Sequence, residues 1–206
     1  MSNLAQRPFT LDNVLVARLF GSIPNPVMRD ALNRYIMEKG EPVTINTVEN
    51  LFQAMKLFYS DRYVQNGRFT EEGKQIFEKI ISEHPSAAKR DGGRNGIVKG
   101  LDQTSWDSES MAIMEVIARY SFDANPGAKG LLLSTGTRQL THTQGDRIWK
   151  EAFPAVLMKI RSDYQKSRIA DTGSAPATTL QATIALYSKT EVTAENFNDV
   201  KNNVEQ

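Results

Sequence analysis

Apolar residues recur at helical spacing through most of the first 165 positions of the chain. Such stretches tend to begin near a capping residue or a proline and to end near glycine or another turn former. Before residue 47, the alternation typical of strands is clear only over Glu41–Ile45. The predicted helical stretches are 14–20, 27–37, 47–58, 70–84, 108–118, 128–133 and 154–164. The pattern therefore predicts a mainly α protein, formally α+β, with only a few short strands.

Local signals mark where several of these helices begin, and either Thr10 or Asp12 is the expected cap of the first. Thr47 and Thr70 are natural N-caps, because a threonine hydroxyl can accept a hydrogen bond from an N–H group of the first helical turn. Asn66-Gly67 predicts a tight turn, and Ser108 is predicted to open a further helix. The segment SAAKRDGGRNGIVKG, residues 86–100, is rich in glycine and basic residues, so we expect a loop there.

The composition changes towards the C-terminus. Pro154 suits the first turn of a helix, so we expect the last core helix to begin there. From Ser167 the segment SRIADTGSAPATT is small and polar, as in a linker, and two weak helical patterns follow it. We therefore expect one domain over residues 1–165 and a C-terminal extension over 166–206, made of a linker plus helices.

Composition and charge exclude several classes of function. The chain has 206 residues, a net charge of +1, no cysteine and two histidines. Without cysteine there is no disulfide, thiolate nucleophile or cysteine metal site, and two histidines make a histidine metal site improbable. The near-neutral charge argues against a broad grip on duplex nucleic acid or on a membrane surface. No apolar run reaches the length of a membrane span, and the first residues lack a signal-peptide core. We expect a cytoplasmic protein.

A narrow polar stripe runs along the otherwise apolar helix predicted over residues 47–58. Glu49, Gln53 and Lys56 fall at positions i, i+4 and i+7 and therefore share one helical face. Charged residues on a helix are usually solvated, so a plain surface face is one reading. The other is a pocket in which a partly desolvated lysine acts as an amine nucleophile beside a carboxylate.

The glycine-rich loop is a second candidate. Gly92 and Gly93 allow the backbone to approach a ligand closely, and Arg94 offers a guanidinium suited to phosphate. The order of residues is neither that of a Walker loop nor G-x-G-x-x-G, so a flexible surface turn is an equally good reading.

The two tryptophans are a third candidate. Trp106 and Trp149 both stand among polar residues. Each either covers the core or provides a platform on which a base stacks. If the segment around Trp149 is helical, Asp146 shares its face and the two bound one pocket.

These pieces occur in an order that resembles the NADAR family (NAD- and ADP-ribose-related, YbiA-like proteins). The order is E-x(3)-Q-x(2)-K on a helix, then G-R, a tryptophan, L-L-x-T-G, D-x(2)-W and L-M-x(2)-R. It spans about residues 43–165. The matching positions are Glu49–Lys56, Gly93-Arg94, Trp106, Leu132–Gly136, Asp146–Trp149 and Leu157–Arg161.

The resemblance implies a compact helical fold and an N-glycosidase that acts on ribosides. Known family activities include removal of ADP-ribose from guanine bases in nucleic acid and cleavage of phosphorylated intermediates of riboflavin synthesis. In the family, the helix lysine is thought to form a Schiff base with the opened ribose. Carried over, the resemblance makes Lys56 the nucleophile, Glu49 the acid/base and Asp146 an assisting carboxylate. Trp149 would stack on the substrate and Arg94 would hold phosphate.

The resemblance also indicates which residues contact the substrate, and it implies neither a cofactor nor a metal. His142 stands near the place where the family has an acidic residue. The substrate-binding residues predicted in this way are Gln53, Gly93, Arg94, Trp106, Thr135, Gly136, His142 and Trp149.

Four functions stay open from the sequence. The first is cleavage of an ADP-ribosylated guanine, either as a small ADP-ribose-containing molecule or on nucleic acid. The second is cleavage of a riboflavin-pathway intermediate. The segment after Trp149 is shorter than in the family, which also allows a non-catalytic protein that binds ADP-ribose or a related NAD derivative. The fourth is a structural or interaction protein that binds its partner through the C-terminal extension.

Overall fold

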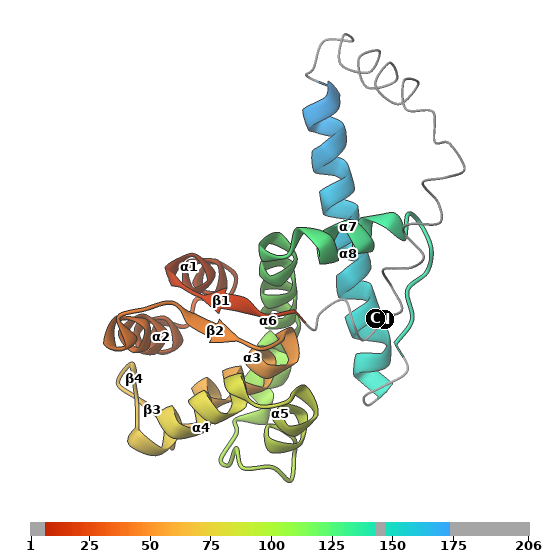
Figure 1. Ribbon diagram of the computed structural model, residues 1–206. Coiled ribbons are helices and arrows are strands. Elements are labelled where there is room, and N and C mark those ends of the chain that lie inside the picture. The colour runs from red at the N-terminus through yellow and green to blue at the C-terminus, as the bar shows by residue number, and fades with distance from the viewer. Residues whose placement is uncertain (1–6, 143–146, 174–206) are drawn as a thin grey trace, which may run out of the picture. The chain divides into compact units, whose positions relative to one another are not determined.

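The computed structural model describes residues 7–142 and 147–173 of the chain. Within these residues there are eight α-helices, one 3₁₀ helix and four short strands (Figure 1). In chain order they are β1 (Phe9–Leu11), α1 (Asn13–Ser22), α2 (Pro26–Lys39), β2 (Val43–Ile45), α3 (Val48–Ala54), η1 (Met55–Tyr59), β3 (Val64–Gln65), β4 (Arg68–Phe69), α4 (Glu71–Ser82), α5 (Pro85–Asp91), α6 (Gln103–Ala124), α7 (Pro126–Ser134) and α8 (Arg147–Gly173). The prediction of a mainly α protein is confirmed.

The chain divides by its internal contacts into two units, Met1–Tyr164 and Gln165–Gln206. The first unit holds the core and all the described residues of the candidate site. Of the second unit, the structure describes only residues 165–173. The helical patterns predicted after residue 174 lie outside the described residues.

The strands form two small antiparallel pairs. β1 pairs with β2, with Phe9 opposite Ile45, so the strand predicted at Glu41–Ile45 is present in its second half. β3 and β4 form a hairpin across the predicted turn at Asn66-Gly67. Both turn residues have positive φ, of 50° and 66°, which is the backbone that a two-residue hairpin turn requires.

The predicted caps at three helix starts are confirmed. The side chain of Thr47 accepts a hydrogen bond from the Asn50 N–H at the start of α3, and Thr70 accepts one from the Gly73 N–H at the start of α4. Asp12, one of two expected caps for α1, accepts from the Leu15 N–H. Each bond satisfies a first-turn donor that the helix itself leaves unpaired.

Two expectations around the glycine-rich segment are wrong. Residues 86–91 are helical, because Pro85 starts α5, a proline being well tolerated in a first turn, and the His84 side chain caps it. The next helix, α6, begins at Gln103 and not at Ser108. Asp102 caps it by accepting hydrogen bonds from the N–H groups of its first turn, which puts Trp106 inside the helix.

The last core helix also differs from the expectation. α8 already runs from Arg147, so Pro154 lies within the helix and does not begin it. α8 continues through residues 167–173, where the small polar composition suggested a linker. Val156, Leu157 and Ile160 are buried, as their spacing predicts.

The segment from Thr47 to Ser60 lies at the centre of the first unit. α3 contacts α4, α5 and α6, which surround it (Figure 1). Every residue from 47 to 60 is buried except Glu49 and Lys56, which are half-buried. A segment enclosed in this way fixes the position of any functional group it carries.

Asn50 ties α3 to the end of α4. Its side chain is fully buried, and its Nδ2 donates to the carbonyl oxygens of Ile80, at 2.7 Å, and Glu83, at 2.8 Å. Asn46, which lies outside α3, also donates to carbonyls at the end of α4, those of Ser82 and Glu83. These bonds lie nearer to solvent than those of Asn50. The two asparagines therefore make similar bonds at different depths.

This difference in depth gives a test of what holds α3 in place. Asn50→Ala should lower the free energy of unfolding by about 2–4 kcal/mol, because it strands buried carbonyl acceptors. Asn46→Ala should cost about 0.5–1 kcal/mol, since water can replace its bonds. Urea unfolding of both variants measures the difference, and equal losses would contradict the proposed role of Asn50.

Candidate functional site

The helix predicted over residues 47–58 changes its winding after Ala54. α3 is α-helical, and η1 continues it as a 3₁₀ helix from Met55. A 3₁₀ helix turns about 120° per residue and an α-helix about 100°, so Lys56 still falls within about 20° of Glu49 around the axis. The polar stripe predicted from the sequence therefore survives the change.

The first two residues of this stripe are joined by a hydrogen bond. Gln53 Nε2 donates to Glu49 Oε1 at 2.9 Å, one helical turn away. The Gln53 side chain is 7% exposed, whereas the Glu49 carboxylate is half-buried. A buried amide thus holds one oxygen of a carboxylate whose surroundings are partly open.

Lys56 lies between a carbonyl and an aromatic face. Its Nζ donates to the Gly92 carbonyl oxygen at 2.6 Å and lies 5.5 Å from the centre of the Trp106 ring. A carbonyl oxygen and a ring face both stabilise a positive charge. These contacts suit the ammonium form of Lys56 at rest.

Gly92 belongs to the glycine-rich segment noted in the sequence, but the predicted substrate-binding residues did not include it. It is buried and is the C-cap of α5. Gly92 is the glycine that contacts Lys56, whereas the predicted site named Gly93. A glycine directly after a helical stretch was the available signal, but the stretch itself was taken for a loop. The turn after it is tight, with the Gly96 N–H bonded to the Gly93 carbonyl at 2.9 Å.

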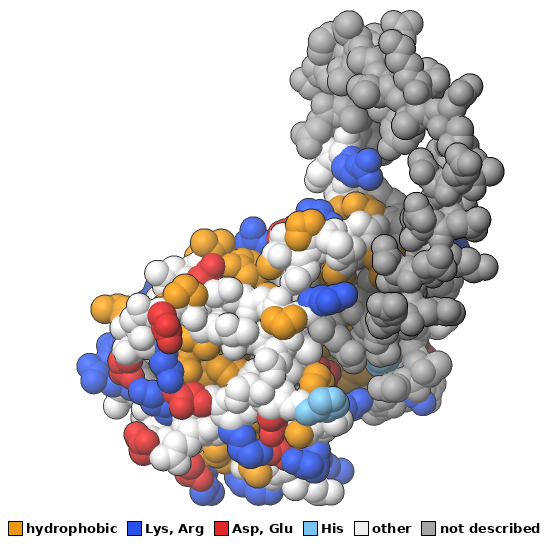
Figure 2. Space-filling view, in the orientation of Figure 1, with side chains coloured by type: hydrophobic (Ala, Val, Ile, Leu, Met, Phe, Trp, Pro, Cys, Tyr) orange, Lys and Arg blue, Asp and Glu red, His pale blue; other side chains and the backbone are white. Residues whose placement is uncertain are grey.

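Basic side chains surround this turn. Lys89, Arg90 and Arg94 are exposed, and the lower edge of the molecule, where α4 and α5 lie, carries a group of Lys and Arg side chains (Figure 2). The carboxylate of Asp91 is buried among them. Hydrogen bonds from Lys79 and Arg90 lower its pKa against the opposing effect of burial, so it stays ionised.

Phe52 joins the two tryptophans. Its ring centre lies 5.0 Å from that of Trp106 and 5.0 Å from that of Trp149. Trp106 is 4% exposed and belongs to the core, so it offers Lys56 a ring face but little surface to a ligand. Trp149 is only half-buried and is the better platform for stacking.

His142 belongs to the same neighbourhood. Burial, and then the nearby charge of Lys89, lower the pKa of its imidazole, while the charge of Glu49 acts in the opposite direction. Its ring lies 5.4 Å from that of Phe153 in α8. His142 is therefore a neutral group near Glu49 at neutral pH, able to donate or accept a hydrogen bond.

A tyrosine that contacts Trp106 is bonded to a second glutamate. The Tyr59 ring is 5.4 Å from the Trp106 ring, and its hydroxyl donates to Glu109 Oε2. Burial, and then this carboxylate, raise the pKa of Tyr59 far above its usual value. Sequence reasoning missed this pair, because the two residues stand 50 positions apart and only the fold brings them together.

Thr135 and Gly136 form the end of α7, where Thr135 has a structural task. Its hydroxyl donates to the Leu132 carbonyl and accepts from Arg161 Nη1, at 2.7 Å. The Arg161 side chain is 6% exposed and also donates to the Arg138 carbonyl. The contact of Thr135 and Gly136 with a substrate stays a prediction.

Asp146 lies outside the described residues, just before α8. The residues that the structure brings together are therefore Glu49, Gln53, Lys56, Gly92, Trp106, Trp149 and His142. Among the described residues, no group of three His, Asp or Glu side chains is placed to hold a metal ion. Within the same residues, no helix has both the length and the apolar character needed to cross a membrane.

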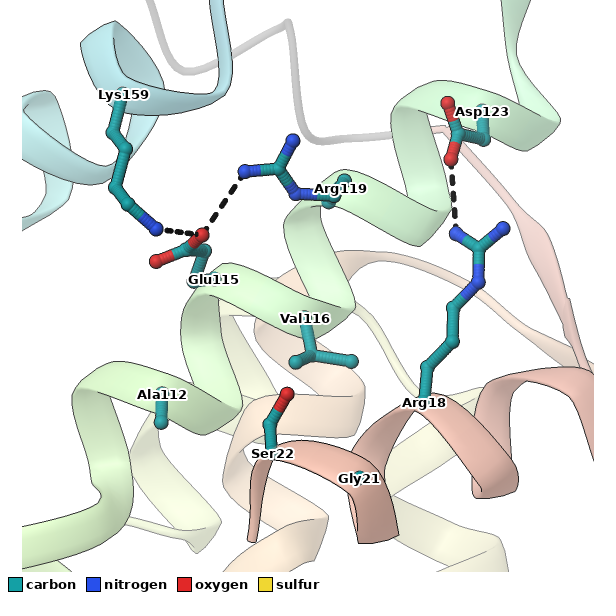
Figure 3. A pocket seen from close by; sticks show the side chains of 9 residues that line it. All are labelled: Arg18, Gly21, Ser22, Ala112, Glu115, Val116, Arg119, Asp123 and Lys159. Carbon is teal, nitrogen blue, oxygen red and sulfur yellow. Dashed lines mark hydrogen bonds and ion pairs between the residues drawn. The ribbon is translucent and has the colours of Figure 1, made fainter. Parts of the chain in front are cut away.

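A hollow of about 600 Å³ lies elsewhere, between α1, α6 and α8 (Figure 3). Its cations are already neutralised: Arg18 pairs with Asp123 at 2.9 Å, Lys159 pairs with Glu115, and Arg119 pairs with both Glu115 and Asp163. Such a surface has little unpaired charge to offer a ligand. We therefore place the candidate site at Glu49 and Lys56 and not in this hollow.

Comparison with known proteins agrees with the sequence resemblance. The model of the NADAR domain matches residues 2–168, which is most of the chain. No curated protein and no solved structure matched the chain. NADAR domains are known for N-glycosidase-type activity. On the strength of a match that covers the whole described core, the chain belongs to the NADAR family.

Proposed function

We propose that the protein is an N-glycosidase that cleaves the bond between base and ribose in an ADP-ribosylated guanine or a related phosphorylated riboside. One observation carries the proposal. In the buried segment 47–60 of a NADAR domain, Glu49 and Lys56 alone are half-exposed, and they lie on one face with Gln53 between them. A carboxylate and a primary amine on one face are the groups that this reaction uses.

The reaction begins with the amine of Lys56 in its neutral form. Its nitrogen forms a bond to C1′ of the ribose, and the bond from C1′ to the base breaks. The electron pair of that bond leaves with the base, which takes a proton from Glu49. Negative charge near C1′ stabilises the oxocarbenium-like transition state.

Water completes the cycle. The nitrogen now bonded to C1′ loses a proton to the Glu49 carboxylate. Glu49 passes this proton to the ring oxygen as the ring opens to a protonated imine. Water then adds to the imine carbon, the C–N bond breaks, and Lys56 is regenerated. The sum is riboside plus water giving base plus ribose.

Glu49 and Lys56 need to share only one proton for this chemistry. At rest the pair is a carboxylate and an ammonium, as the contacts of Lys56 with the Gly92 carbonyl and Trp106 favour. In the reactive state the proton lies on Glu49 and the amine is free to attack, so no external acid is required. Substrate binding would have to draw Lys56 away from the Gly92 carbonyl.

The exposed groups around the pair fit a phosphorylated riboside. Arg94 and Lys89 are exposed next to the site and would bind phosphate, and Trp149 would stack on the base. Phosphate held at a distance from the reacting carbon positions the ribose. We rank ADP-ribosyl-guanine first, because a net charge of +1 suits a small adduct better than a long duplex.

The function is tested by offering the full-length protein two substrates side by side. One is an oligonucleotide with ADP-ribosylated guanine, and the other is a phosphorylated riboflavin-pathway intermediate. We expect free guanine by mass spectrometry from the first. Release from the second alone would move the substrate to the riboflavin pathway. No release from either, with a raised melting temperature in ADP-ribose, would show a binder and not an enzyme.

Lys56 is tested by two substitutions of different charge. Lys56→Ala and Lys56→Arg should both abolish base release, since neither side chain can form an imine, while both keep ADP-ribose binding. Arginine keeps the cation that meets Gly92, so it controls for a purely electrostatic role. Borohydride added during turnover should leave a reduced adduct on the Lys56 peptide. Turnover by the arginine variant would contradict the amine mechanism.

Glu49 is tested by removing its charge at constant size. Glu49→Gln should lower kcat about 10²–10⁴-fold, the usual contribution of general acid–base catalysis. The measurement is the rate of base release at saturating substrate, with Glu109→Gln as the control, because this carboxylate bonds to Tyr59 and not to Gln53. An equal loss in both variants would contradict a specific role for Glu49.

A further inference from the structure

The peptide at Gly92 contacts both halves of the candidate site. Its carbonyl oxygen accepts the hydrogen bond from Lys56 Nζ at 2.6 Å. Its Cα faces Gln53, the residue that holds Glu49. Gly92, at the end of α5, therefore contacts both Lys56 and the side chain that holds Glu49.

Glycine is required at position 92 by space and not by backbone conformation. Its φ of −83° is open to any residue. A Cβ atom there, however, would lie 2.4 Å from Gln53 Oε1 and 2.7 Å from Gln53 Cβ. Since the Gln53 Cβ belongs to the enclosed helix α3, it has little room to yield.

The orientation of the Gln53 amide is forced by its two neighbours. Its N–H group points at the Glu49 carboxylate, because the reverse orientation would set two oxygens against each other. Its own oxygen then faces Gly92, where it is buried and has no hydrogen-bond partner within the described residues. A buried acceptor without a partner costs free energy. The protein tolerates this cost in the arrangement that fixes Glu49.

We propose that Gly92 is a positioning residue that sets both Glu49 and Lys56, the first by seating the Gln53 amide and the second through its own carbonyl. This inference rests on the proposed N-glycosidase function. It adds a residue that the family motifs quoted above do not contain, since they name Gly93 and Arg94. Gly92 itself takes no part in bond making.

The test compares two glycine-to-alanine variants of the full chain. Gly92→Ala should lower kcat about 10–100-fold, the loss expected when a catalytic group is displaced by about 1 Å. Gly130→Ala, in α7, is the control, because nothing lies within 4 Å of its added Cβ. The loss should fall on kcat with KM unchanged in Gly92→Ala alone, since Gly92 positions the reacting groups and does not bind the substrate. An unchanged kcat in Gly92→Ala would overturn the inference.

A second variant covers the case in which Gly92→Ala does not fold. Gln53→Ala introduces no clash and should by itself lower kcat and leave KM unchanged. A structural role in packing alone would lower stability and leave the kcat of the folded protein where it is. An unchanged kcat in Gln53→Ala would therefore also overturn the inference.

A readout without turnover separates this inference from the proposed function. Limited acetylation with acetic anhydride, followed by peptide mass spectrometry, reports how readily Lys56 presents a neutral amine. The rate at Lys56 should rise several-fold in Gly92→Ala relative to Gly130→Ala, because the carbonyl acceptor is displaced. An equal rate would contradict the inference even if no riboside were cleaved, and a wild-type protein without turnover would contradict only the proposed function.

Discussion

The burial of one short segment, Thr47 to Ser60, is the constraint on which the rest of the structure depends. Three helices enclose it, so each polar group that it carries has to be satisfied inside the protein or reach its edge. Asn50 is satisfied inside the protein, and its hydrogen bonds to two carbonyls tie α3 to α4. Glu49 and Lys56 instead reach the edge of the protein. Their positions relative to the core are therefore fixed by packing and not by a mobile loop.

The same enclosure decides the resting state of the pair. The Gly92 carbonyl and the Trp106 ring stabilise the cation of Lys56, so the amine that we propose as the nucleophile is held in its unreactive form. In the proposed reaction, the proton has to move to a group that can later give it to the leaving base. We propose Glu49 for this step because, within the described residues, the hydrogen bond to its carboxylate comes from the Gln53 amide and occupies one oxygen.

Much of the fold follows from signals that act within a few residues. Threonine caps and the Asn66-Gly67 turn depend only on local hydrogen bonds and backbone angles, and all were predicted. α5 was missed because the glycines after Asp91 outweighed a short helical stretch begun by Pro85. The requirement for glycine at position 92 was beyond local reasoning, because it comes from Gln53, 39 positions earlier in the chain.

The motifs that carry the family resemblance divide into two groups when their contacts are followed. The helix motif and the two tryptophans meet around Phe52 and Lys56, where a reaction can be argued. The L-L-x-T-G and L-M-x(2)-R motifs instead meet each other, through the bond from the Arg161 guanidinium to the Thr135 hydroxyl. A guanidinium that is 6% exposed needs acceptors, and Thr135 with the end of α7 supplies them. The need to hold α7 to α8 is enough to explain why this second group of motifs is present. A residue that belongs to the family motifs therefore does not have to contact the substrate.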